Sequence, residues 1–198
     1  MTTQTAIKKN DVIEYFTAFI LACDSEAESF KVKIESAQSE DEKKALKEQQ
    51  SKFNTKARYA RRLIANEVIT DAVATQVVRL KLSKDQLKEM MQDSYAIAKF
   101  VPMMICLVQK RKMQSDDEHV LSEFLALVAA GANDLTFTQF GNKMRNQKGN
   151  AYAYRQPQMC CKMLARLSAV EYRKDGATVV ARFLHDSVLG KMLMKAYE

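Results

Sequence analysis

The sequence predicts a mainly α-helical protein: an N-terminal helical bundle followed by a smaller C-terminal part with a β-hairpin. Apolar residues make up 47% of the 198 residues, which is enough to bury a core. Only 5 Gly and 2 Pro are present, too few turn residues for a β-sandwich. Most apolar residues recur at the three- and four-residue spacing of amphipathic helices. These three observations favour helices over most of the chain.

Capping boxes predict where the N-terminal helices begin. In this motif Ser or Thr is followed three residues later by Glu or Gln, so that two backbone N–H groups at the helix start find acceptors. The pattern, with one Asp variant, predicts helix starts at Asp11, Ser25, Ser39, Ser83 and Ser115.

Apolar stripes fill the segments between these starts. One stripe lies within 12–20, a second within 30–37, and a third within 46–68, which belongs to a single long helix expected from Glu40 to about Leu80. Residues 95–112 are apolar almost all round and predict a buried central helix that Pro102 either kinks or restarts. Residues 1–113 are therefore expected to form a helical bundle.

The C-terminal part mixes helices with short strands. The Asp-Gly pair at 175–176 is a strong hairpin signal, and Gly131 is a natural helix stop. In chain order we expect a helix over 116–130, a short strand over 135–137, a helix over 138–146, a turn at 148–150, a helix over 155–168, strands over 169–173 and 178–183, and a helix over 186–197.

This order resembles a winged helix-turn-helix domain over about residues 115–184. The segment MLARLSAVEYRKDGATVVARFL resembles a recognition helix that runs into a wing. It departs from the pattern at Ser168, where many winged domains carry Gly, and in a long turn over 147–154. The resemblance implies a DNA-binding domain over 114–198, with the helix at 155–168 in the major groove and a wing tip at 173–176.

Positive charge is concentrated in two stretches without acidic residues. The net charge is +7, and residues 131–198 alone carry +6. No Asp or Glu lies between Asp134 and Glu171, nor from Gln49 to Asn66. Such one-signed stretches indicate a polyanionic partner, the alternative being a chance cluster whose charge other residues compensate in the fold.

The candidate DNA-binding residues come mainly from the helix at 155–168. Its basic and amide side chains lie opposite its apolar arc, an arrangement that is typical of recognition helices but also of solvated amphipathic ones. The candidates are Lys143, Arg145, Lys148, Arg155, Gln158, Lys162, Arg166, Arg173 and Lys174. A second basic patch comprises Lys52, Lys56, Arg58, Arg61 and Arg62.

The sequence thus predicts a protein that binds duplex DNA, either a transcription regulator or a DNA-organising factor. One alternative is a protein-interaction module that binds a polymerase or host factor. Another is a single-strand or RNA binder that stacks bases on Tyr152, Tyr154 and Tyr172. We expect a homodimer, because helix-turn-helix proteins commonly read two half-sites, with the long helix from Glu40 as the interface; a monomer is the alternative.

Other classes of protein are not expected. Two His and four Cys lack metal-ligand spacing, and no Gly-rich phosphate loop is present, so we expect no enzyme, no metal and no cofactor. Cysteines without a pairing pattern indicate a reducing compartment, hence the cytoplasm. The longest nearly apolar run, 100–108, is too short to cross a membrane, and the first 11 residues lack a signal-peptide core.

Overall fold

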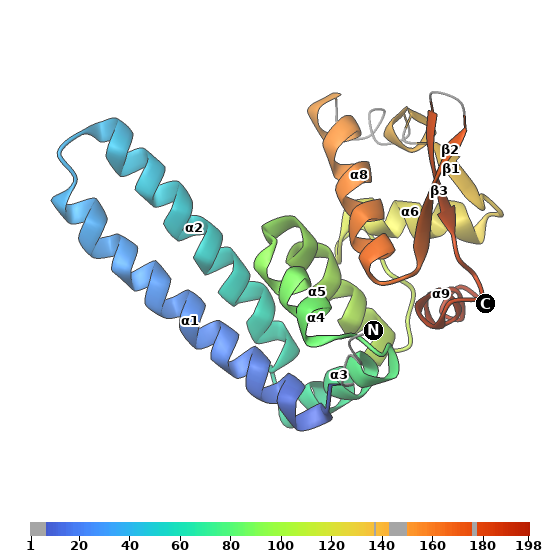
Figure 1. Cartoon of the computed structure of the whole chain (residues 1–198), viewed down its shortest axis with the longest axis horizontal. Coiled ribbons are helices and arrows are strands. Elements are labelled where there is room, and N and C mark those ends of the chain that lie inside the picture. The colour runs from blue at the N-terminus through green and yellow to red at the C-terminus, as the bar shows by residue number, and fades with distance from the viewer. Residues whose placement is uncertain (1–6, 137, 143–149, 176–177) are drawn as a thin grey trace, which may run out of the picture. The chain divides into compact units, whose positions relative to one another are not determined.

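The structure, a computed structural model, describes residues 7–136, 138–142, 150–175 and 178–198. The described chain is mainly α-helical with a small antiparallel sheet near the C-terminus, which confirms the predicted fold class (Figure 1). It divides into two compact units, residues 1–101 and 102–198. The sequence prediction placed the boundary later, after residue 113.

The N-terminal unit is built on a helical hairpin. Helices α1 (Lys9–Ser36) and α2 (Glu40–Leu63) run antiparallel along their whole length, and α3 (Glu67–Arg79) and α4 (Lys84–Gln92) pack near the open end of the hairpin (Figure 1). Apolar side chains at that end are fully buried and form the core: Val12, Phe16, Ala57, Ala60, Leu63, Val73, Val77 and Leu87.

Two predicted features of this unit are wrong. Ser25 begins no helix, because α1 keeps a single buried seam through Ile20, Cys23 and Ala27 and continues past it. The long helix expected from Glu40 to Leu80 ends at Leu63. A new helix follows, whose first turn is capped by the Asn66 side chain accepting from the Ile69 N–H at 2.9 Å. The starts predicted at Ser39 and Ser83 are confirmed, the latter as a complete capping box.

The boundary between the units falls inside α5 (Ser94–Val108), at Pro102. The helix continues through this proline, so the predicted restart does not occur. The next helix, α6 (His119–Ala129), begins after the predicted Ser115, with Glu118 as its cap. The cause is the Asp117 carboxylate, which accepts from Arg111 and from the Gln114 N–H and so holds the preceding residues in a turn.

The C-terminal unit contains a three-stranded sheet of order β1-β3-β2, formed by β1 (Asp134–Thr136), β2 (Val170–Asp175) and β3 (Thr178–Phe183). The short strand and the hairpin predicted from the sequence are therefore parts of one sheet. Residues 138–142 are helical, and the rest of the helix predicted to 146 lies outside the described residues. Phe124 of α6 contacts Phe140 and Phe183, with ring centroids at 5.5 and 6.2 Å, and anchors the core.

Helix α8 (Asn150–Arg166) starts earlier than predicted, at Asn150 and not near Arg155. Pro157 consequently lies inside the helix, whereas the prediction placed it in the first turn. The last helix, α9 (Val188–Met194), is shorter than predicted and is capped by the Ser187 hydroxyl, which accepts from the Gly190 N–H.

Candidate nucleic-acid interface

Helix α8 has one apolar face that fixes it in the C-terminal unit. Cys160, Cys161, Met163, Leu164 and Leu167 are buried, and the helix packs against α6 and β2. Burial raises the pKa of the Cys161 thiol to about 12, so this group stays protonated at neutral pH. The cysteines of α8 therefore behave as core residues.

The opposite face of α8 carries the side chains that the sequence predicted for DNA. Arg155, Gln158, Lys162 and Arg166 are all exposed. Their spacing of three or four residues places them on one stripe, which extends about 16 Å along the helix axis. The helix contains no acidic residue. It therefore presents three cations and an amide to solvent on a rigid element.

The end of α8 directs the chain straight into the hairpin. Ser168 adopts a left-handed conformation with φ of 57°. Its N–H donates to the Ala165 carbonyl at 3.0 Å, and the Ala169 N–H donates to the Leu164 carbonyl at 2.9 Å. This is a Schellman motif, which usually has Gly at the left-handed position. It explains how Ser replaces Gly here while the hairpin still follows the helix without a linker.

A row of charges crosses the exposed side of the sheet. Asp134 of β1 accepts from Arg182 of β3 at 3.0 Å and from Arg173 of β2 at 3.1 Å, and Arg182 also lies 3.8 Å from Glu171. The hydrogen bond from Arg182 and the two nearby guanidinium charges hold the pKa of Asp134 below its usual range. Both acids that bound the acid-free stretch are thus paired within the sheet.

These ion pairs change the surroundings of the predicted wing contact. The Arg173 guanidinium already holds a carboxylate, so a contact between Arg173 and a phosphate would have to compete with Asp134. For Lys174 the structure gives the backbone position in β2 but not the side chain. Lys143, Arg145 and Lys148 lie outside the described residues, as do the side chains of Tyr152 and Tyr154.

The second basic patch is divided by the fold. Arg61 donates to both carboxylate oxygens of Asp24 on α1 at 2.6 Å. Lys56 is half-buried, with its ammonium 5.2 Å from the centre of the Phe53 ring. Lys52, Arg58 and Arg62 are exposed. The five residues therefore form no single surface, although Arg58 and Arg62 share one face of α2.

Sequence reasoning missed two lysines on that same face of α2. Lys44 and Lys47 are exposed and lie three or four helical turns before Arg58. The acidic residues around them, Glu40–Glu48, make this segment look like a mixed solvated surface when it is taken in sequence order. A helical projection of the whole of α2 would have grouped the four cations.

Comparison with known proteins gives no match for this chain, whether with family models, with curated sequences or with solved structures. Among the described residues, no three His, Cys, Asp or Glu side chains are grouped so that they could hold a metal ion. No described helix combines the length and the apolar character that a membrane span requires. The function must therefore be argued from the surfaces described above.

Proposed function

We propose that the C-terminal unit is a winged helix-turn-helix domain that binds duplex DNA, with α8 in the major groove and the β2–β3 hairpin as the wing. Its role would be regulation of transcription or organisation of DNA. In this proposal Gln158 and Lys162 face base edges, while Arg155 and Arg166 contact phosphates on either side.

The exposed stripe on α8 carries this proposal. A major groove accepts an α-helix, and Arg, Lys and Gln match the acceptors and donors of guanine, phosphate and adenine. The Schellman turn at Ser168 places β2 directly after the helix, as a wing requires. The order helix, strand, helix, helix, hairpin in the described residues also agrees with the winged pattern.

Duplex binding measured by fluorescence anisotropy tests the proposal. With five or six phosphate contacts, the logarithm of the affinity should fall against the logarithm of salt with a slope of roughly −5. The double variant Lys162→Ala/Arg166→Ala should bind at least about tenfold more weakly and make the slope less negative by about 1, because Arg166 is the phosphate contact that it removes. Lys195→Ala, an exposed cation after α9, is the control and should change neither quantity.

Two results would contradict the proposal. If the double variant binds the duplex like the unchanged protein while its helical content is normal, α8 is not the recognition element. If no duplex is bound even at low salt, the DNA proposal fails.

A single-strand or RNA binder is the second candidate. The observation in its favour is Tyr172 of β2, an aromatic residue that is 42% exposed, because single-strand binders stack bases on exposed aromatic rings. In the same assay, an unpaired strand that competes better than its duplex, with the preference lost in Tyr172→Ala, would favour this candidate.

A further inference from the structure

The outward side of α2 forms a continuous polar and basic face. Its members follow one another at spacings of three or four residues, so they lie on one side of the helix, and each is exposed. This surface, the outer α2 face, consists of Lys44, Lys47, Ser51, Asn54, Arg58 and Arg62. From Lys44 to Arg62 it extends about 27 Å along the helix axis.

The opposite side of α2 is used for packing, which fixes the outer face toward solvent. Ala57, Ala60 and Leu63 are buried, and Phe53 stacks on Phe30 of α1 with ring centroids 5.8 Å apart. The helix therefore cannot rotate to bury its cations without exposing this seam.

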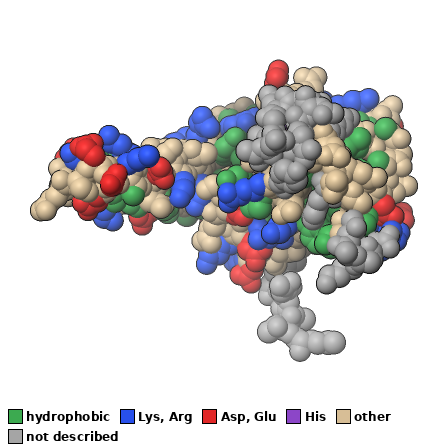
Figure 2. Space-filling view, turned by 90° about the horizontal axis from the view of Figure 1, so that it is seen from above, with side chains coloured by type: hydrophobic (Ala, Val, Ile, Leu, Met, Phe, Trp, Pro, Cys, Tyr) green, Lys and Arg blue, Asp and Glu red, His purple; other side chains and the backbone are tan. Residues whose placement is uncertain are grey.

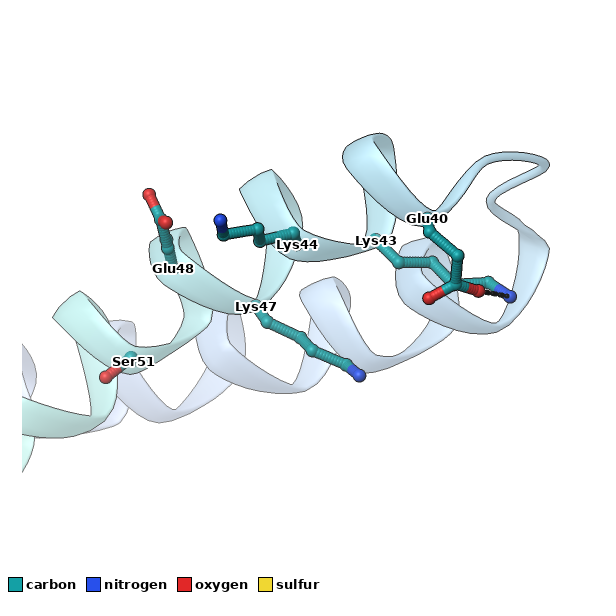
Figure 3. Close-up of a pocket in the computed structure, with 6 residues that line it drawn as sticks. All are labelled: Glu40, Lys43, Lys44, Lys47, Glu48 and Ser51. Carbon is teal, nitrogen blue, oxygen red and sulfur yellow. Dashed lines mark hydrogen bonds and ion pairs between the residues drawn. The ribbon is translucent and has the colours of Figure 1, made fainter.

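The charge of the outer face is positive and is little compensated along its C-terminal half. No acidic residue occurs from Gln49 to Asn66, and Asp24 of α1 is already bound to Arg61. At the other end the charge is partly compensated, because Glu40 pairs with Lys43 at 3.0 Å and Glu48 lines the same depression as Lys44 (Figure 3). Acidic and basic side chains are mixed near the tip of the hairpin (Figure 2).

The surface is also hollowed along this face. One shallow depression, about 400 Å³, is lined by Lys44, Lys47 and Ser51 together with Lys43 and two acidic residues, Glu40 and Glu48 (Figure 3). A second, about 210 Å³, lies between Lys47 and Arg58, where the side chains of Ser51, Asn54 and Thr55 are short. Lys47 and Arg58 thus lie at the two ends of this depression, and hydroxyl and amide side chains line it between them.

We propose that the outer α2 face binds the phosphate backbone of duplex DNA, independently of base sequence. Lys and Arg neutralise phosphates, and Ser, Thr and Asn are common donors to phosphate oxygens. The face contains no large apolar side chain, whereas the centre of a protein–protein interface is usually apolar. A helix on a membrane surface needs a free apolar face, and here that face packs against α1.

This surface adds a second DNA contact to the one proposed for α8. The choice of duplex DNA as the ligand rests on the proposed function, but all the residues that would bind it here belong to the N-terminal unit. Nothing in the proposal requires the two surfaces to meet the same stretch of duplex.

Two variants with equal changes of charge test the proposal in the full chain. The first, Lys47→Gln/Arg58→Gln/Arg62→Gln, removes three cations from the outer α2 face. The control, Lys31→Gln/Arg79→Gln/Lys88→Gln, removes three exposed cations that lie elsewhere in the N-terminal unit. Affinity for a labelled duplex of arbitrary sequence is measured by anisotropy over a range of salt, and helical content by circular dichroism.

The first variant should bind about tenfold or more weakly at low salt, with a slope less negative by up to roughly 3. The control should keep the affinity within about twofold. The conservative variant Arg58→Lys/Arg62→Lys should bind like the unchanged protein, because a phosphate accepts either cation. That third measurement separates loss of charge from loss of fold.

The proposal is overturned if the first variant binds as tightly as the control, or if both are weakened equally, since bulk charge alone would then account for binding. Binding of polyglutamate that the first variant loses, without any duplex binding, would assign the face to an acidic protein. If the α8 variant keeps its affinity while the outer-face variant loses it, the α8 proposal fails and this one stands. If instead the α8 variant loses affinity while the outer-face variant keeps it, the proposal for the outer α2 face fails and the α8 proposal stands.

Discussion

At the scale of single residues, Arg111 and Asp117 hold the connection between α5 and α6. Two guanidinium nitrogens of Arg111 donate to the two carboxylate oxygens of Asp117 at 2.6 and 2.7 Å, and the Gln114 N–H donates to the same carboxylate at 2.9 Å. The Asp117 side chain is only 13% exposed. The hydrogen bonds from Arg111 and Gln114 lower the pKa of Asp117 to about 2.

This lowered pKa predicts a pH-dependent contribution to stability. The native carboxyl has a pKa below its ordinary value of 3.8, so the contribution is fully present above about pH 4 and is lost as pH falls toward 2. Asp117→Asn should reduce the free energy of unfolding by about 2 kcal/mol at pH 7. Urea denaturation at pH 7 and at pH 2.5 measures it, and the variant should differ less at the lower pH.

The neighbouring Asp116 is the matched control. Its side chain is exposed, so Asp116→Asn should leave the free energy of unfolding nearly unchanged at both pH values. If both variants lose the same free energy of unfolding, the connection is stabilised by negative charge near the start of α6 and not by the two hydrogen bonds from Arg111 to Asp117.

At the scale of elements, several helices end in a left-handed residue. Gly131 after α6 has φ of 97°, but Lys110 after α5 and Ser168 after α8 take similar conformations, with φ of 51° and 57°, without being glycine. A non-glycine residue in this region costs about 1 kcal/mol. The chain thus carries backbone strain at the turn that joins α8 to the hairpin.

Relief of this strain should raise stability. Ser168→Gly is expected to raise the thermal midpoint by about 2–4 °C, because Gly adopts positive φ without penalty. Ser168→Ala should have little effect, which isolates the backbone contribution. Gly131→Ala should lower the midpoint by a similar amount, since its φ disfavours a side chain although space is open around it. A lower midpoint in Ser168→Gly would contradict this explanation.

The sequence correctly predicted those helix starts and ends that only a few neighbouring residues determine. The capping box at Ser83 and the stop at Gly131 use only a few neighbouring residues, and both are confirmed. The pattern at Ser25 looks the same locally, but the long seam shared with α2 keeps α1 intact. The break after Leu63 was missed because the apolar stripe continues across it, although Asn66 is a strong cap.

The candidate site was predictable where it lies on one helix. The exposed stripe of α8 follows from the 3.6-residue period alone. The pairing of Arg173 with Asp134, 39 residues away, follows from strand register and could not be read locally. The same holds for Arg61, which Asp24 reaches only because α1 and α2 run antiparallel.

At the scale of the whole molecule, burial is uneven along the α1–α2 hairpin. From residue 28 to residue 56 no described side chain is fully buried, and the stacked Phe30 and Phe53 are only half-buried. Toward the open end, α3 and α4 complete the core. The single long helix expected as a dimer interface is wrong, since α2 ends at Leu63. The homodimer itself stays a prediction, with its interface on the half-buried side of the hairpin tip that carries Phe30 and Phe53 and not on the outer α2 face.

Hydrogen exchange along the hairpin tests both points together. With few buried contacts, the tip half should open locally at low free energy, so backbone amides over 30–55 should exchange much faster than those near Phe16 and Ala60. Exchange followed by mass spectrometry at about 1 and 100 µM adds the dimer test, because association slows exchange only where a partner covers the chain. In a monomer the fast exchange persists at both concentrations, and light scattering gives a mass near 22.5 kDa. In a dimer formed through the hairpin, protection over 30–55 rises with concentration, the mass doubles, and Phe53→Asp abolishes both. Slow exchange of the tip half in a protein of monomeric mass would contradict the burial argument.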